Sequence, residues 1–411
     1  MDVLHSRIAA VDVGKKELVV CVRFPPGIEG GERRQEVRTF GTATRDLLKL
    51  RDWLTEAGVA SVVMEATGQY WRGVFYVLEE AVDVVLVNPA HVKGLPGRKT
   101  DVLDAVWLCR LAECGLVKAS FVPPEPVRQL RDLTRHRASL LGERTRQVQR
   151  LEKTLEDAQI KISSVLTDLL GVSGRAMIEA LIAGERDPVV LANLAKGRLR
   201  ARIPELVDAL EGRFGEHHGF LCGQLLRLID ELTRLLEELT RRIEDAVRPW
   251  ERQILLLQTI PGVGRKTAET IVAETGALME RFPTAGHLSS WAGVTPGHYE
   301  SAGKASSTHT GPGSRWLAAA LGLAALSAGR SKYTYLGARY GWLAPKIGGQ
   351  RANVALQRDI LTAVWHMLKN DQPYRDPGGD YYDRKDPEGT RRRAVGQLRR
   401  VGFHVELSRT A

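Results

Sequence analysis

The sequence has few cysteines and no long apolar segment. Its 411 residues include four cysteines, none in a Cys-X-X-Cys pair or beside histidines at the spacing of a zinc site. We therefore expect free thiols in a reducing compartment, without disulfides or structural zinc. The longest uncharged apolar stretch, residues 316–329, is shorter than the roughly 20 residues that a transmembrane helix needs. The first residues also lack the basic start and apolar run of a signal peptide. These absences predict a soluble, cytoplasmic protein that does not enter a membrane.

Positive charge is in excess. The chain has 59 lysines and arginines against 49 acids, a formal net charge of +10, with 43% hydrophobic and 26% charged residues. The composition is ordinary for a globular protein, and the length exceeds that of one compact core, which predicts two or three domains. The basic excess favours a polyanionic partner, nucleic acid above all.

The first 118 residues alternate between strand and helix patterns. They predict a hairpin over residues 6–24 with a turn at Gly14, then strands at 36–40, 60–65 and 83–88, and helices at 44–57, 69–81 and from 101 onward. This order is typical of a mixed α/β sheet, in which functional residues gather at strand ends.

Four carboxylates occupy such positions. Asp12 and Glu65 each end an apolar strand, whereas Asp101 and Asp104 lie three residues apart on one face of a helix that Thr100 is expected to cap. Acids brought together repel one another unless a hard cation such as Mg²⁺ binds between them, singly or as a pair of ions. The alternative is that the two helical acids only complement the helix dipole and that the strand acids only cap loops.

The segments around these acids, residues 10–16 (AVDVGKK), 63–68 (VMEATG) and 99–105 (KTDVLDA), resemble the Asp-Glu-Asp-Asp motifs of a RuvC-like domain with the RNase H fold. More narrowly, they resemble insertion-sequence transposases of the bridge-RNA-guided recombinase family, which carry this domain at the N-terminus. The resemblance implies that Asp12, Glu65, Asp101 and Asp104 are catalytic and bind Mg²⁺.

Residues 119–250 form a predicted helical, coiled-coil domain after a proline-rich linker at 121–126. Basic residues recur over 128–153, and we interpret Arg135, Arg137 and Arg144 as contacts to nucleic-acid phosphates. A solvated helix face would give the same pattern. Leucines at 225, 228, 232, 235 and 239 follow the 3-4 spacing of a coiled-coil seam. The seam predicts a dimer contact, or alternatively a helical hairpin within one chain.

Residues 251–370 are expected to form a mostly helical domain with a helix-hairpin-helix motif. In residues 257–267 (LQTIPGVGRKT), Gly262 and Gly264 would let backbone N–H groups approach a phosphate, and Arg265 and Lys266 would add charge. Such contact holds a backbone without reading sequence. A plain glycine turn between two helices is the alternative. The basic tail, residues 371–411, is either a further nucleic-acid contact or a solvated segment.

Ser301 lies in a loop rich in serine, threonine and glycine, and a serine without a nearby base is weak evidence of a nucleophile. However, residues 296–304 (PGHYESAGK) resemble the segment of the same family's C-terminal transposase domain that carries its catalytic serine. The match implies that Ser301 is the nucleophile and that Lys304 contacts nucleic acid. Residues 306–310 are nearly neutral, whereas family members are often more basic after the serine.

Together these resemblances imply an α/β plus all-α transposase that cuts and rejoins donor and target DNA. A Mg²⁺-dependent acidic site and a covalent phosphoserine would act together in a dimer or tetramer, and a structured noncoding bridge RNA would guide the reaction. Two alternatives remain, a metal-dependent junction-resolving nuclease of RuvC type without a serine role, and a non-catalytic scaffold that binds RNA or DNA. The start of the chain is also similar to actin-like ATPases, but their later phosphate-binding glycine loops are missing.

Overall fold

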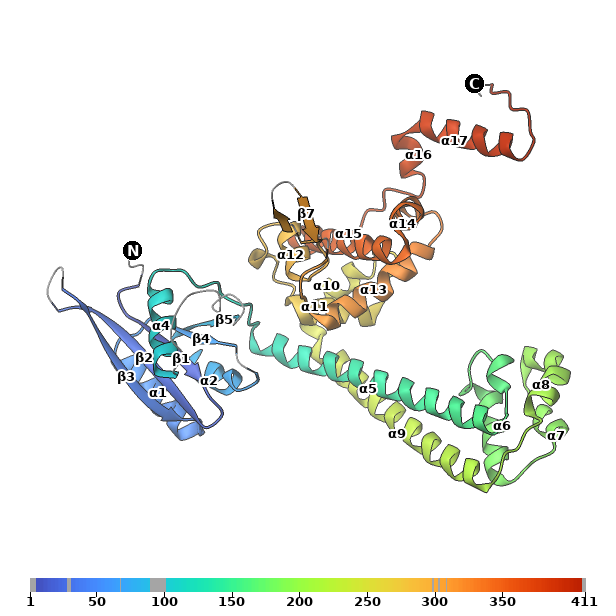
Figure 1. The fold of residues 1–411 in the computed structure, drawn as a ribbon, viewed down its shortest axis with the longest axis horizontal. Helices are drawn as coiled ribbons and strands as arrows, with labels where there is room; N and C mark the ends of the chain where they lie inside the picture. The colour runs from blue at the N-terminus through green and yellow to red at the C-terminus, as the bar shows by residue number, and fades with distance from the viewer. Residues whose placement is uncertain are drawn as a thin grey trace. The chain divides into compact units, whose positions relative to one another are not determined.

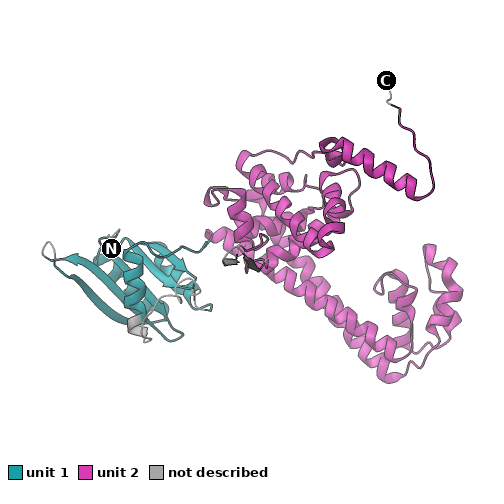
Figure 2. Cartoon of the chain, turned by 45° about the horizontal axis from the view of Figure 1, so that its top comes forward, with its two compact units in different colours: residues 1–122 teal, residues 123–411 magenta. Residues whose placement is uncertain are grey.

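The computed structural model describes residues 5–27, 31–66, 68–88, 101–297, 299–301, 304–307 and 309–408, with the backbone alone at 101–103, 299–301 and 304–307. The chain forms two compact units, Met1–Val122 and Pro123–Ala411 (Figure 2). The boundary between them falls in the proline-rich segment, while the finer four-part division stays a prediction. Over the described ranges, no helix has the length and apolar character needed to cross a bilayer.

The first unit contains a five-stranded mixed sheet of order β3-β2-β1-β4-β5. Strands β1 to β3 pair antiparallel, whereas β4 runs parallel to β1 and β5 runs parallel to β4. The predicted α/β pattern is confirmed. The strands are β1 (Ile8–Val13), β2 (Glu17–Pro26), β3 (Arg33–Gly41), β4 (Ser61–Glu65) and β5 (Asp83–Val87), and the helices are α1 (Thr44–Glu56), α2 (Trp71–Leu78) and α4 (Asp101–Glu113).

Alternate side chains of β1 enter different cores, as the two-residue period of a strand requires. Ala9 and Val11 pack with α1 and α2 on one face of the sheet. Ile8 and Ala10 pack with α4 on the other face, around the buried Cys109. The four cysteines are free thiols, as predicted, and only Cys114 is not buried.

The second unit is almost entirely helical. Its long helices α5 (Glu125–Asp157) and α9 (Glu216–Ala246) pack lengthwise against each other, α5 leading out and α9 returning (Figure 1). The chain between them forms a small core with both helices. It contains the 3₁₀ turns η1 (Ile162–Ser164) and η2 (Gly197–Arg202) and the helices α6 (Val172–Ala183), α7 (Pro188–Ala192) and α8 (Ile203–Leu210).

The structure shows one of the two interpretations of the predicted leucine seam. Within the chain, α9 packs on α5, which is the helical-hairpin alternative. The buried residues of α9 in their shared core are Cys222, Leu226 and Ile229, whereas Leu228 is 44% exposed. The 3-4 spacing therefore identified a packed helix but assigned one of its exposed positions to the buried face.

The remaining helices share a core with residues of α5 and α9, represented by Leu130 and Ile243. A two-stranded sheet, β6 (Tyr299–Ser301) and β7 (Lys304–Ser307), lies between α12 and α13 in the chain. The helices are α10 (Glu251–Leu257), α11 (Arg265–Thr275), α12 (Ala285–Trp291), α13 (Arg315–Arg330), α14 (Tyr335–Ile347), α15 (Gly349–Asn370), α16 (Tyr381–Lys385) and α17 (Pro387–Arg400), with 3₁₀ turns η3 (Arg248–Trp250) and η4 (Met279–Arg281).

Candidate active site

Asp12 and Glu65 lie at the same level on adjacent parallel strands, Asp12 one residue before the end of β1 and Glu65 at the end of β4. Register pairs Val11 of β1 with Met64 of β4, and each acid is the next residue of its strand. Matched positions on neighbouring parallel strands project from the same face of the sheet. That face is the one under α4, because Ala10, two residues before Asp12, packs in the core that contains α4. The two half-buried acids thus belong to one edge and one face of the sheet.

Helix α4 points its first residues toward this edge. Near its end, the Cys109 thiol donates to the carbonyl oxygen of Ile8 at 3.5 Å, at the opposite end of β1 from Asp12. Asp101 precedes Cys109 by eight residues, about 12 Å of helix. Asp12 follows Ile8 by four residues, about 13 Å of strand. The backbone at Asp101 is therefore level with Asp12.

Glu113 fixes the other end of α4. Its carboxylate forms ion pairs with Arg23 of β2 and, at 3.3 Å, with Arg33 of β3. Because Arg23 is the register partner of Ile8, this ion pair independently places the end of α4 beside the start of β1. Sequence reasoning missed Glu113, although an acid on the side of a helix that covers a sheet is a signal of such a pair.

The donor chemistry of the acidic quartet fits Mg²⁺, which prefers carboxylate oxygens. Asp104 is exposed, and the side chain of Asp101 and the whole of Thr100 lie outside what the structure describes. Among the described side chains, no three acids, histidines or cysteines are grouped closely enough to hold a metal. The structure thus brings Asp12 and Glu65 together and leaves the complete metal site a prediction.

Ser301 is at the tip of a hairpin, where the sequence suggested a loop. It ends β6 and pairs in register with Lys304, the first residue of β7. The side chains of both residues lie outside the described part, and their roles stay predictions.

The chain segments on either side of this hairpin, residues 292–297 and 309–313, form its stem. Their backbones lie in close contact. The amide of Gly297 donates to the carbonyl of His309 at 3.0 Å. Below it, Gly313 crosses Ala292 so closely that a Cβ on Gly313 would lie 2.1 Å from the Ala292 carbonyl oxygen. Ser314, the next residue, caps α13 through the amide of Leu317. The serine-bearing tip is thereby fixed to the helical core.

Replacing Gly313 with alanine is expected to destabilise this stem by about 1–3 kcal/mol, because the added methyl group overlaps a backbone oxygen. Urea unfolding measures the loss. Gly311→Ala is the matched control, since no atom lies within 4 Å of a Cβ built at that glycine and the effect should be small. Equal losses in the two variants would contradict the close-packing argument.

Helices α10 and α11 are joined by a turn over residues 258–264, an arrangement that agrees both with the expected helix-hairpin-helix and with a plain glycine turn. Gly262 has φ +85°, and a Cβ there would lie 2.4 Å from the carbonyl oxygen of Ala324, so its close approach is to α13. Gly264 and Lys266 are exposed at the start of α11. The N-terminus of a helix favours an anion, and phosphate contact here stays a prediction.

All four arginines predicted to contact nucleic acid have partners inside the unit, and three of them pair with acids. Arg265 forms two hydrogen bonds to Glu251 at 2.7 and 2.8 Å, which tie α10 to α11. Arg135 likewise donates twice to Glu274, at 2.7 and 2.8 Å. Arg137, only 7% exposed, lies 2.7 Å from Glu269.

These pairs change the interpretation of α5. Glu269 and Glu274 of α11 are each 1% exposed, so the arginines neutralise buried acids and hold α5 against α11. Arg144 donates to the Thr233 hydroxyl of α9 at 2.8 Å. The sequence-level signal that we missed was a pair of acids within the apolar stretch of α11. Phosphate contact by these arginines stays a prediction.

Two family models match the sequence. Residues 9–160 match the DEDD-type domain model described as a transposase, and residues 255–340 match the model described as "Transposase IS116/IS110/IS902 family". Both models describe transposases, so by class these two segments are similar to transposase domains. The description of the second model makes the similarity more specific, to the IS116/IS110/IS902 family.

Among solved structures, the chain is similar to the Thermus thermophilus RuvC structure, with 17% identity over 28% of this chain and 99% of that chain and a TM-score of 0.22. It is also similar to T. thermophilus RuvC in complex with a Holliday junction substrate, with 15% identity over 28% of this chain and 100% of that chain and a TM-score of 0.21. A comparison with curated proteins found no match.

Proposed function

We propose that this transposase cuts and rejoins DNA strands with Asp12, Glu65, Asp101 and Asp104 as ligands of Mg²⁺ and Ser301 as nucleophile. The observation that carries the proposal is the adjacent placement of Asp12 and Glu65 at one sheet edge, level with the start of α4. Carboxylates so placed create a negative edge that favours a hard cation. The two transposase-domain matches support strand transfer as the reaction.

When bound, Mg²⁺ would polarise the phosphate and offset negative charge that develops on it. In the proposed reaction, the Ser301 hydroxyl oxygen forms a bond to phosphorus and the bond from phosphorus to the departing strand oxygen breaks. The serine loses one proton and the departing oxygen gains one. The phosphoserine retains the energy of a phosphodiester, so a second strand can displace the serine and complete recombination without another energy source.

We also propose that a structured noncoding bridge RNA selects donor and target DNA by base pairing, while the protein holds backbones and shape. The net charge of +10 and the exposed start of α11 support contact with nucleic-acid backbones. A homodimer or tetramer would supply the acids and the serine needed for paired strand cuts.

A covalent-trapping assay tests this function. Protein, Mg²⁺, RNA from the element's own flank and labelled donor and target DNA are mixed, denatured and separated on a gel. We expect a DNA–protein adduct that is absent in Ser301→Ala and retained in Ser307→Ala, a control on the neighbouring strand. Cleaved DNA without an adduct, unchanged by Ser301→Ala, would overturn the serine mechanism in favour of a metal-dependent nuclease.

A further inference from the structure

The C-terminal segment packs on the helical core through stacked aromatic side chains. The ring of Tyr382 in α16 stacks on Trp342, with centroids 5.2 Å apart and planes 11° from parallel, and on Tyr335 at 6.2 Å and 12°. Its hydroxyl accepts a hydrogen bond from Arg339 at 2.9 Å, and Arg339 also binds Asp359 at 3.0 Å. A tail that served only as a solvated end would need no such anchor.

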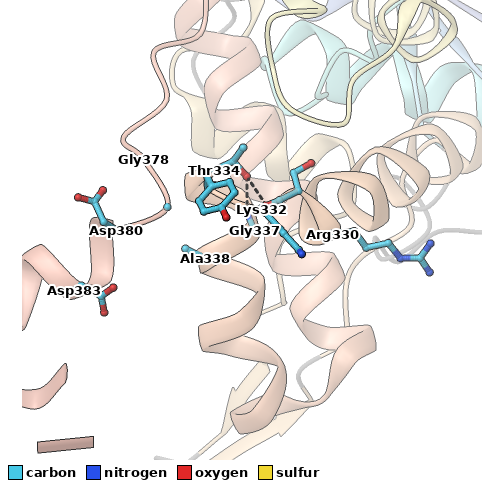
Figure 3. A pocket seen from close by; sticks show the side chains of 12 residues that line it. Arg330, Lys332, Thr334, Gly337, Ala338, Gly378, Asp380 and Asp383 are labelled. Carbon is cyan, nitrogen blue, oxygen red and sulfur yellow. Dashed lines mark hydrogen bonds between the residues drawn. The ribbon is translucent and has the colours of Figure 1, made fainter. Parts of the chain in front are cut away.

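The chain just before α16 is fixed as well. The Gly379 amide donates to the Tyr333 carbonyl at 3.0 Å. Beside this contact lies a cavity of about 650 Å³, lined by Arg330 and Lys332 on one side and by Asp380 and Asp383 on the other (Figure 3). Because its charges are of both signs, this cavity does not favour an anion. The uncompensated positive charge lies further along, on α17.

Helix α17 begins at an N-cap residue, Asp386. The Asp386 carboxylate accepts a hydrogen bond from the Gly389 amide at 2.9 Å, which starts the helix directly after α16. The helix contains five arginines and one acid, Glu388. Glu388 lies 3.7 Å from Arg391. In the described part of the chain, no acid pairs with the remaining exposed arginines, which are Arg392, Arg393, Arg399 and Arg400.

The arginines form two groups, residues 391–393 and 399–400. From Arg392 to Arg400 the helix rises about 12 Å, which matches the roughly 12 Å width of the major groove of B-DNA. Between the groups, Gly396 follows Arg392 by four residues and so lies on the same helix face, where it leaves room for close approach. The neighbouring Gln397 has an amide that can pair with adenine. The major groove of A-form RNA is deep and too narrow for side chains to read.

We propose that α17 binds duplex DNA in the major groove, with its two arginine groups at the two flanking phosphate backbones and α16 as the anchor that carries it. The proposal extends the transposase function, on which it rests, to a DNA-holding arm outside both family-model matches. Phosphate contacts at both ends would position the helix, and the absence of a side chain at Gly396 would permit contact with base edges.

The test is binding of full-length protein to a labelled mixed-sequence DNA duplex, followed by fluorescence anisotropy over a range of salt concentrations, without Mg²⁺ or RNA. For Arg392→Ala/Arg400→Ala we expect on the order of tenfold weaker binding near 0.1 M salt. The slope of log K against log salt should fall by about 1.8, or 0.9 for each lost phosphate contact. The Arg392→Lys/Arg400→Lys variant should keep most of the slope, because it keeps both charges.

The matched control is Arg45→Ala/Lys49→Ala on α1, where both side chains are exposed, at 84% and 69%, on the sheet face away from α4. It removes the same charge and should leave duplex binding unchanged. Unaltered affinity and salt slope in the α17 variant would overturn the proposal. A larger loss for a structured RNA hairpin than for duplex DNA would overturn it in favour of RNA.

A changed oligomeric state with unchanged DNA binding would overturn the proposal in favour of a protein contact, for which the exposed Leu398 and Phe403 would be suited. The binding assay contains no Mg²⁺ and requires no strand cleavage. Its result therefore does not depend on whether the trapping assay yields a covalent adduct. Circular dichroism of each variant verifies that the helices are intact.

Discussion

DNA strand cleavage is expected to fall by about 10³-fold when Asp12 is replaced by asparagine. The substitution keeps the size of the side chain but removes one of the two charges that β1 and β4 bring to the same edge. Removing a charged metal ligand from a phosphoryl-transfer site is expected to raise the activation free energy by several kcal/mol. An increase of about 4 kcal/mol corresponds to a factor of roughly 10³ in rate. The measurement is the single-turnover rate of cleavage of labelled donor DNA at saturating Mg²⁺.

Asp83→Asn provides the control for this prediction. Asp83 is an exposed acid at the first position of β5, paired in register with Ser61, and so lies at the opposite end of the parallel strands from Glu65. Its replacement removes the same charge from the same sheet and should leave the rate within twofold. A rate for Asp12→Asn equal to that of the Asp83 variant would mean that the acidic edge takes no part in cleavage.

Local sequence was enough to predict the strands of the first unit, because β1, β4 and β5 are short apolar runs bounded by glycine or polar turns. Pairing between β1 and β4 was not predictable in the same way. The two strands are about fifty residues apart in the chain. A shift of one residue in their pairing would no longer align Asp12 with Glu65, and the correct register depends on packing over the whole sheet. The family resemblance supplied the grouping that local rules could not.

The second unit shows the complementary limit. The charge run on α5 looked like a solvent or phosphate-facing surface, but Arg135 is paired with Glu274, 139 residues later in the chain. Gly262 was correctly predicted to be in a turn, while the reason for the glycine is contact with α13, which periodicity cannot identify. In both cases the local pattern gave the element, and a distant part of the chain decided which of its faces is covered.

Replacing Glu274 with glutamine is expected to lower the free energy of unfolding of the second unit by about 2–3 kcal/mol. The carboxylate is 1% exposed and accepts hydrogen bonds from Arg135 and, at 3.0 Å, from the Ser314 hydroxyl. Removing one member of a buried pair typically costs about 3–5 kcal/mol because the other charge is left uncompensated. Since the Arg135 side chain keeps 29% of its exposure, water relieves part of that cost. Urea unfolding monitored by circular dichroism measures the change.

Glu231→Gln separates this effect from a general loss of charge. Glu231 pairs with Arg234 on the surface of α9 at 2.7 Å, with both side chains about half exposed, and such pairs contribute roughly 0–1 kcal/mol. Equal destabilisation by the two substitutions would contradict a buried anchor at Glu274. A double-mutant cycle with Arg135→Met then isolates the coupling, which should exceed about 1 kcal/mol if the two side chains act as one unit. Because Ser314 follows the stem of the serine hairpin, the same substitution should also reduce adduct formation at Ser301, whereas Glu231→Gln should not.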